Sequence, residues 1–375
     1  MASNGKKVGI ITFHASYNCG SMLQAFALQK FLKKNGYDTE MIDFSSNGQR
    51  RLYSIYAKRK SLNNFIRNTI FLLHKKRISN NFRHYEDFKR SQFNLTEYNT
   101  SSNSDIIDRY DSVVAGADQI WNITISDYDD AYFLNWVKNA KRIAYAPSFG
   151  AKNPSDHSDN PQKYTDFLNS FDSLSIREFN GQKWIKELCG REAKVVLDPT
   201  LIVDPEDYAP ITSDKLNLPD KYIFYYSPGF SHDINTLTKR ISKKYNLPVI
   251  AFNAKSFYTK GMNFKGFKLP NFEDPTAYLQ LMKNASMVIT TSFHGCIFST
   301  VFKKNFWAVK NGGMFGTDDR VLTLLKQLSI EDRMVPIEFN DDFDYLKSVD
   351  YTQYDINLKT LKEESQNYLL SALEG

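Results

Sequence analysis

The stretch MVITTSFHGCIFSTVF, residues 287–302, places one apolar segment directly before another. Its first residues, MVITT, are apolar and β-branched and predict a buried strand, whereas CIFSTVF predicts the first turns of a buried helix. Between the two segments stand Ser292 and His294, followed at once by Gly295. A titratable ring is an unusual choice for stability at such a junction. We therefore interpret His294 as a candidate ligand contact, and a structural histidine is the alternative.

The same order of strand, polar loop and helix recurs along the chain. KVGIITF at 7–13 predicts a strand, HASYNCG a polar loop, and SMLQAFALQKFLKKNGY a helix that is stopped by Gly36. Strands that alternate with helices are typical of a parallel sheet covered by helices. The proline-rich segment DPTLIVDPEDYAP separates two such sets and is the predicted linker.

We therefore predict an α/β protein with two Rossmann-like lobes that face a central cleft. The predicted boundaries are 1–205 for the N-terminal lobe, with a basic helical excursion at about 50–90, 215–340 for the C-terminal lobe, and 350–375 for a C-terminal helix.

The composition restricts the class of protein further. The 375 residues, 42% of them apolar, suffice for two cores. The three cysteines lack CxxC spacing, and we find neither a signal-peptide pattern nor an apolar stretch of about 18 residues. These features predict a cytoplasmic protein. Because no Gly-x-Gly-x-x-Gly, Walker loop or His/Cys metal spacing occurs, we expect no cofactor and no metal.

The positive charge is concentrated in one segment. Between residues 50 and 90, twelve Lys and Arg stand against two acidic residues, in a chain whose total net charge is only +6. The segment also contains apolar residues such as Phe65 and Ile66. A helix of this kind can lie on an anionic membrane surface or bind a diphosphate head group. The alternative is a solvated helix that packs by its apolar face. Nucleic-acid binding is disfavoured because no motif accompanies this single block.

Polar loops follow the predicted strands where an open parallel sheet binds its ligands, beside the starts of helices. Free N–H groups and the helix dipole favour an anion there. Ser292 suits a phosphate or carboxylate oxygen, and it can equally act as a helix N-cap. The residues predicted to bind substrate are Asn18, Gly20, Ser21, Gln24, Asp118, Gln119, Trp121, Asn122, Ser148, Ser292, Gly295 and Arg320.

Arg177 ends a further predicted strand, in SLSIREFNG. Its planar guanidinium can clamp a carboxylate or phosphate through two hydrogen bonds. The alternative is a structural ion pair between Arg177 and the adjacent Glu178.

The order of these segments resembles the polysaccharide pyruvyl transferase family. The resemblance is carried by GIITFHASYNCGSMLQAFALQKFLKKNGYDTEMIDF, VAGADQIWN, YFLNWV, IAYAPSFG, LSIREFNG, VVLDPTLIVD and ITTSFHGCIFSTVFKKNF, and it extends over residues 8–333. Three short motifs depart mildly from the family pattern: NCGS at 18–21, GADQ at 116–119 and DDR at 318–320. These departures concern substrate preference more than the reaction.

The resemblance implies a fold like that of GT-B glycosyltransferases, phosphoenolpyruvate as donor, and a pyruvate ketal installed on a cell-surface polysaccharide, such as a capsular one, or on its lipid-diphosphate-linked precursor. The matched family residues are His294 and Arg177. A histidine that titrates near neutral pH can donate a proton to the donor. Family habit suggests galactose bridged at O4 and O6 as the acceptor. A location at the inner face of the cytoplasmic membrane would suit a lipid-linked acceptor.

Two other functions are compatible with this architecture, because a fold does not settle a function. The first is a nucleotide-sugar glycosyltransferase, although we find no acidic partner for a ribose in the second lobe. The second is a sugar-binding protein without catalytic activity, which the intact His294, Arg177, Asp118 and Gln119 disfavour.

Overall fold

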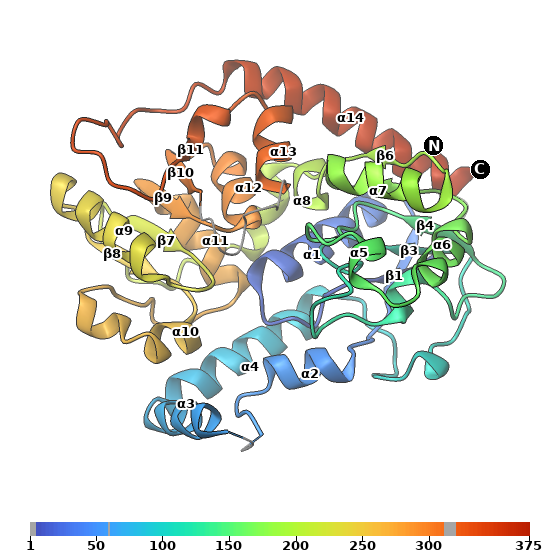
Figure 1. Ribbon diagram of the computed structural model, residues 1–375, viewed down its shortest axis with the longest axis horizontal. Helices are drawn as coiled ribbons and strands as arrows, with labels where there is room; N and C mark the ends of the chain where they lie inside the picture. The colour runs from blue at the N-terminus through green and yellow to red at the C-terminus, as the bar shows by residue number, and fades with distance from the viewer. Residues whose placement is uncertain (1–4, 59–60, 311–319) are drawn as a thin grey trace.

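The computed structural model describes residues 5–58, 61–310 and 320–375, which form two α/β lobes side by side (Figure 1). The N-terminal lobe contains a parallel sheet with the order β2 (Asp38–Met41), β1 (Lys7–Ile11), β3 (Ser112–Ala115) and β4 (Lys141–Ala144). A short parallel pair, β5 (Ser175–Ile176) and β6 (Lys194–Val195), lies next to β4 and is joined to it by a bridge between Ile143 and Ser173.

The C-terminal lobe contains a second parallel sheet. Its order is β11 (Met334–Val335), β10 (Phe306–Val309), β9 (Met287–Thr290), β7 (Ile223–Tyr226) and β8 (Val249–Ala251). Strands β3, β7, β9 and β10 are buried along their whole length, as expected for strands covered on both faces. The predicted fold class is confirmed, and β11 is a strand that the sequence pattern had not indicated.

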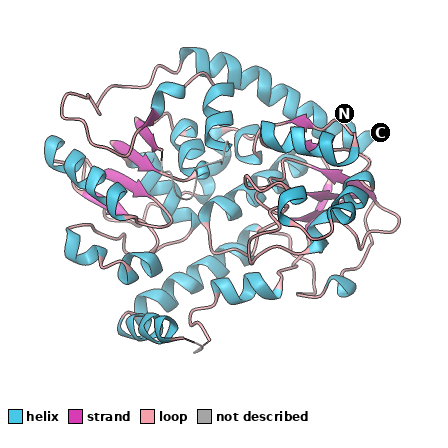
Figure 2. Cartoon of the chain, viewed as in Figure 1, coloured by secondary structure: helices cyan, strands magenta, loops and turns pink. Residues whose placement is uncertain are grey.

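Helices surround both sheets (Figure 2). The α-helices are α1 (Cys19–Lys34), α2 (Asn47–Tyr53), α3 (Leu62–Leu73), α4 (Lys75–Gln92), α5 (Pro154–His157), α6 (Pro161–Asn169), α7 (Phe179–Cys189), α8 (Pro199–Ile202), α9 (His232–Tyr245), α10 (Ala254–Thr259), α11 (Pro275–Asn284), α12 (Phe293–Val301), α13 (Arg320–Gln327) and α14 (Thr352–Glu374). The segment predicted to be a linker, 198–210, folds as α8 and most of a 3-10 helix, Pro205–Ile211.

The two lobes share an apolar core. Phe26 of α1 contacts Tyr208, which packs edge-on against Phe298 of α12, and Phe298 in turn meets Tyr278 of α11. These rings belong to one continuous cluster of buried residues that draws on both lobes. Close packing of this kind fixes the position of α1 relative to α12.

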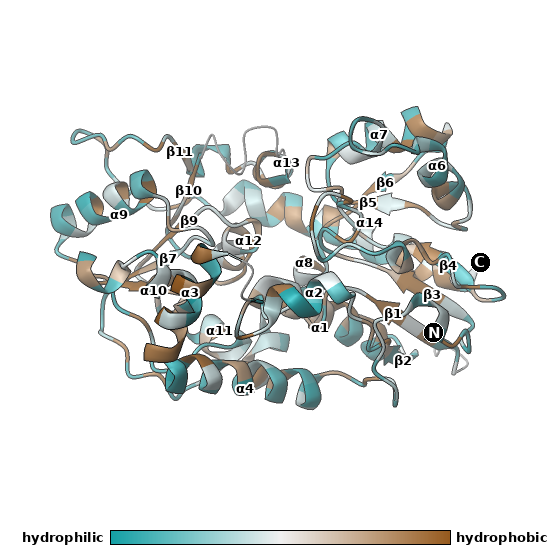
Figure 3. Ribbon diagram, turned by 60° about the horizontal axis from the view of Figure 1, so that its bottom comes forward, coloured by the Kyte–Doolittle hydropathy of each residue, from teal (hydrophilic) through white to brown (hydrophobic). Residues whose placement is uncertain are grey.

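Two helices reinforce the junction. Helix α14 starts at the C-terminal lobe and runs to the N-terminal lobe (Figure 1), where it contacts β4. Tyr351, just before it, donates to Lys304 O, while Tyr368 near its end donates to Ala144 O. Helix α4 lies along the opposite side of the junction (Figure 3). No helix in the described parts of the chain is long and apolar enough to cross a membrane.

Candidate active site

His294 lies in the first turn of α12, where the lobes meet. Ser292 caps the helix, its Oγ accepting a hydrogen bond from the Gly295 N–H at 3.3 Å. The imidazole packs on Gly20 at the start of α1, so closely that an added Cβ at Gly20 would lie 2.3 Å from His294 Nδ1. Gly295 is tightly packed as well, because a Cβ there would meet Thr290 Oγ1 at 2.1 Å. The glycines therefore allow two helix starts to converge on one histidine.

A buried carboxylate, Asp198, joins His294 to Arg177. Its Oδ2 accepts a hydrogen bond from Arg177 Nη1 at 2.7 Å and lies 3.5 Å from His294 Nε2. Its Oδ1 accepts from the N–H and the hydroxyl of Thr200, so Asp198 also caps α8. Burial by itself would raise the pKa of Asp198, but His294 and Arg177 outweigh burial and hold this pKa below its usual range. Asp198 is therefore a fixed negative charge between two nitrogen groups.

Arg177 is 3% exposed and is placed by several contacts. Its guanidinium lies 4.2 Å from the centroid of the Phe293 ring, and its Nη2 is 3.7 Å from Asp118 Oδ1. Among the described residues, Arg177 Nε and Nη2 and His294 Nε2 are buried without a hydrogen-bond partner. Unsatisfied buried N–H groups of this kind are costly and call for an acceptor.

Asp118 connects this cluster to α1. Its Oδ2 accepts a hydrogen bond from Ser21 Oγ at 2.5 Å, and its Oδ1 accepts from the Gln119 N–H at 2.8 Å. Its backbone O accepts from the Ser148 N–H at 2.8 Å. Asp118 has a positive φ of 71°, a conformation that Asp tolerates better than most residues. The carboxyl ends of β3, β4, β5 and β6 thus meet at one point.

Glu178 does not pair with Arg177 as the structural alternative had assumed. Its Oε1 instead accepts hydrogen bonds from Ser148 Oγ at 3.0 Å and the Phe149 N–H at 2.8 Å. Burial raises the pKa of Glu178 to about 7, although Arg177 and Arg320 oppose this rise. Arg320, at the start of α13, therefore lies within electrostatic reach of the cluster.

The predicted residues fall into three groups. His294, Arg177, Ser21, Asp118, Ser148, Ser292, Gly20, Gly295 and Arg320 lie at the junction or directly support it. Others form a second layer. Gln24 is fully buried, bonded to Thr12 Oγ1 and the Ala117 N–H, and Trp121 packs in the core with its indole N–H donated to Tyr132 O.

The remaining predicted residues support loops. Asn18 caps α1, its side chain accepting from the Gly20 N–H. Gln119 and Asn122 are joined through Asn122 Nδ2 and Gln119 Oε1 at 3.1 Å. Gly150 packs on this pair, because an added Cβ would lie 2.3 Å from Gln119 Oε1.

Asp198 is the functional residue that sequence reasoning missed. The signal was its position directly after a strand, in VVLDPT, followed by a helix start. Its prolines led to an interpretation as a linker. Among the described residues, no group of three or more His, Cys, Asp and Glu could hold a metal ion. The cluster itself combines the guanidinium of Arg177, the imidazole of His294 and the carboxylates of Asp198 and Asp118.

Two α/β lobes, each built on a parallel sheet, meet at the carboxyl ends of their strands. This architecture defines a GT-B-like protein. A comparison with protein families matches residues 18–313 to the polysaccharide pyruvyl transferase family. The chain belongs to this family. No curated protein matches the sequence significantly.

Solved structures with a similar course of the chain have little sequence identity. A UDP-N-acetylglucosamine 2-epimerase from Rickettsia bellii is 12% identical, with 99% of this chain and 98% of that chain covered and a TM-score of 0.48. UGT89C1 from Arabidopsis thaliana is 12% identical, with 99% and 100% covered and a TM-score of 0.47. The E. coli heptosyltransferase WaaC with ADP is 9% identical, with 96% and 99% covered and a TM-score of 0.41. Similarity at this level says nothing about the activity of this chain.

Proposed function

We propose that this pyruvyltransferase moves the pyruvyl group of phosphoenolpyruvate onto two hydroxyls of a sugar and releases phosphate. The observation that carries the proposal is the set of unsatisfied N–H groups on buried Arg177 beside His294. Phosphoenolpyruvate carries a carboxylate and a phosphate, and an arginine fork is suited to either group. A nucleotide-sugar donor is not favoured by any particular contact of this cluster.

In the proposed reaction, His294 donates a proton to the terminal methylene of the enol phosphate. The adjacent carbon becomes oxocarbenium-like, and a sugar hydroxyl attacks it. Phosphate then leaves, and a second hydroxyl closes the ketal. Of the two hydroxyl protons lost, one replaces the proton that became part of the methyl group, and the other departs with phosphate. Asp198 stabilises protonated His294 and orients its ring from 3.5 Å.

For the acceptor we propose galactose, bridged at O4 and O6, in a capsular or other cell-surface polysaccharide or its lipid-diphosphate-linked precursor. A peripheral position at the inner face of the cytoplasmic membrane would bring the enzyme to such a precursor. The support is α3, whose apolar side chains are largely solvent-exposed within a strongly basic segment. The exposed side chains are Leu62, Phe65, Ile66, Leu72 and Leu73.

The test combines donor binding with isotope incorporation. Calorimetry should detect phosphoenolpyruvate binding to the wild type, with a nucleotide sugar titrated in parallel. Turnover in deuterated water should place solvent deuterium in the product methyl. His294→Ala should lose about 10²–10⁴ in rate, whereas His157→Ala, an exposed histidine on α5, should not.

Three results would count against the proposal. A product that keeps a vinyl methylene would be an enol ether and would exclude the ketal mechanism. Near-normal turnover by His294→Ala would remove this histidine from the chemistry. Binding of the nucleotide sugar alone would favour a glycosyltransferase.

A further inference from the structure

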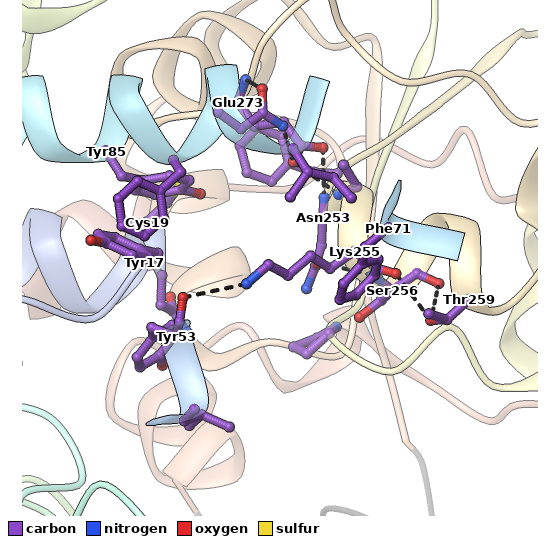
Figure 4. A pocket seen from close by; sticks show the side chains of 18 of the residues that line it. Tyr17, Cys19, Tyr53, Phe71, Tyr85, Asn253, Lys255, Ser256, Thr259 and Glu273 are labelled. Carbon is purple, nitrogen blue, oxygen red and sulfur yellow. Dashed lines mark hydrogen bonds between the residues drawn. The ribbon is translucent and has the colours of Figure 1, made fainter. Parts of the chain in front are cut away.

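A cavity of about 410 Å³ lies beside the first turn of α1 (Figure 4). The parts of the chain that line it include the residues before and at the start of α1, the end of α2, helices α3 and α4, the end of β7, the segment from β8 to α10, and Glu273. Asn18 and Cys19 line this cavity, whereas the next two residues, Gly20 and Ser21, contact the His294 and Asp118 cluster. The cavity therefore borders the candidate active site at the start of α1.

Two cationic side chains, Arg67 of α3 and Lys255 of α10, line the cavity. Lys255 Nζ donates to Ser54 O at 2.9 Å, and a second contact to Tyr53 O measures 3.4 Å. Among the described residues, neither cation forms an ion pair with a carboxylate, and Arg67 Nε is buried without a hydrogen-bond partner. Burial, followed by repulsion from Arg67, lowers the pKa of Lys255 to about 8. Two cations held close together without a carboxylate favour an anionic ligand.

Glu273, the one acidic side chain among the described residues that line the cavity, already accepts several hydrogen bonds. Its two oxygens accept hydrogen bonds from the Asn253 N–H at 2.9 Å and the Ala254 N–H at 2.8 Å, and Asn81 Nδ2 donates to it at 3.0 Å. Burial raises the pKa of Glu273 to about 7, so its negative charge is reduced near neutral pH. Glu273 therefore fixes the cavity wall without neutralising Lys255.

The rest of the lining is rich in aromatic rings. Tyr17 packs against Phe82 and Tyr85 of α4, and Phe71 and Phe252 also line the cavity. Aromatic faces with a few placed polar groups are typical of pockets for small ligands, and such faces pack well on the C–H groups of sugar rings.

We propose that this cavity binds a phosphate-bearing acceptor sugar, with its phosphate or diphosphate held by Arg67 and Lys255 and its sugar directed toward the first turn of α1. This inference rests on the proposed pyruvyl transfer, because the bound sugar would then lie beside the donor at His294. Arg67 belongs to α3, whose exposed apolar side chains suit a lipid carrier of such a diphosphate.

The experiment is a set of calorimetric titrations of the full-length protein, with and without saturating phosphoenolpyruvate. The probes are galactose 1-phosphate, UDP-galactose, dodecyl diphosphate and free galactose. Arg67→Gln and Lys255→Met should each weaken binding of the phosphorylated probes about tenfold to 100-fold. Arg83→Gln and Lys260→Met remove exposed cations outside the cavity and should leave binding unchanged. Phosphoenolpyruvate binding should be the same in all four variants.

A pH series separates an anion site from a structural role of Lys255. Wild-type affinity for galactose 1-phosphate should decrease as the pH rises above about 8, and Lys255→Arg should keep its affinity to higher pH because arginine stays charged. Tighter binding of dodecyl diphosphate than of UDP-galactose would identify a lipid-linked source, and the reverse a nucleotide-linked one. Wild-type affinity in both Arg67→Gln and Lys255→Met would overturn the inference, as would galactose binding equal to that of its phosphate. If the wild type does not bind phosphoenolpyruvate, the proposed reaction is refuted. The binding of the phosphorylated probes still tests the cavity in that case.

Discussion

Asp198 and Glu178 are two buried carboxyl groups near Arg177. Replacing each by its neutral amide should change the stability of the fold in different ways. Asp198 is held ionised by Arg177 at 2.7 Å and by His294 at 3.5 Å, with its pKa below the usual range. Glu178 is buried with its pKa raised to about 7. Asp198→Asn therefore removes a charge that the fold depends on, whereas Glu178→Gln resembles a form that the fold already accepts.

The magnitudes follow from burial and pairing. Removing one partner of a buried ion pair costs about 3–5 kcal/mol, and we expect about 3 kcal/mol for Asp198→Asn because Asp118 still faces Arg177 at 3.7 Å. Glu178→Gln retains an oxygen that can accept from Ser148 and the Phe149 N–H, so at pH 5 we expect a change of less than about 1 kcal/mol.

The two substitutions should also differ in how their effects on stability change with pH. Because the folded pKa of Asp198 is lowered, its contribution is present above its unfolded pKa of about 4 and is lost only as the pH falls through the lower folded value. Asp198 therefore stays ionised from pH 5 to 8, and Asp198→Asn should cost stability throughout this range. Because the folded pKa of Glu178 is raised from 4.5 to about 7, wild-type stability decreases as the pH rises between those values. The stability of Glu178→Gln relative to the wild type should therefore increase by about 2 kcal/mol from pH 5 to pH 8.

Urea unfolding followed by circular dichroism at pH 5, 6.5 and 8 measures these differences. Equal costs for Asp198→Asn and Glu178→Gln at every pH would refute the reasoning. So would a stabilising Asp198→Asn, since that would mean that burial, and not pairing with Arg177 and His294, dominates the energy of Asp198.

Two further predictions concern separate parts of the molecule. Gly20→Ala should displace the His294 ring, lower turnover at least tenfold and cost about 1–3 kcal/mol of stability, because its Cβ would lie 2.3 Å from His294 Nδ1 and 2.7 Å from His294 Cβ; unchanged turnover would mean that the ring position does not matter. Phe65→Ser with Ile66→Ser should reduce co-sedimentation with phosphatidylglycerol vesicles, and wild-type binding should weaken as salt rises. Leu346→Ser, which changes an exposed leucine elsewhere, is the matched control, and an equal loss there would argue against α3 as the contact.

The sequence pattern was sufficient for the fold class and for part of the cluster. Alternating apolar segments predict parallel strands, and the rule that ligands lie at the carboxyl ends of such strands brings Asp118, Arg177 and His294 to one place. The structure brings these three residues together at the junction of the lobes. The positions of these three residues follow from the parallel-sheet topology, which the apolar periodicity of the sequence predicts well.

The remaining features depend on contacts between distant segments. Asp198 acquires its role only because β6 ends near both Arg177 and a helix from the other lobe. Trp121 and Gln24 follow polar loops in the sequence, yet their full burial is a property of tertiary packing that no local pattern reports. The cavity at Arg67 and Lys255 likewise joins segments nearly 190 residues apart in sequence.

The short segment from Asn18 to Ser21 explains why donor and acceptor sites would be adjacent. Asn18 caps α1 and lines the aromatic cavity, while Gly20 accommodates the His294 ring and Ser21 binds Asp118. The start of α1 can therefore contact both a bound sugar and the proton donor. Because the shared core of the lobes fixes α1 against α12, the two sites would be aligned before either ligand binds, which lowers the entropic cost of bringing the reactants together.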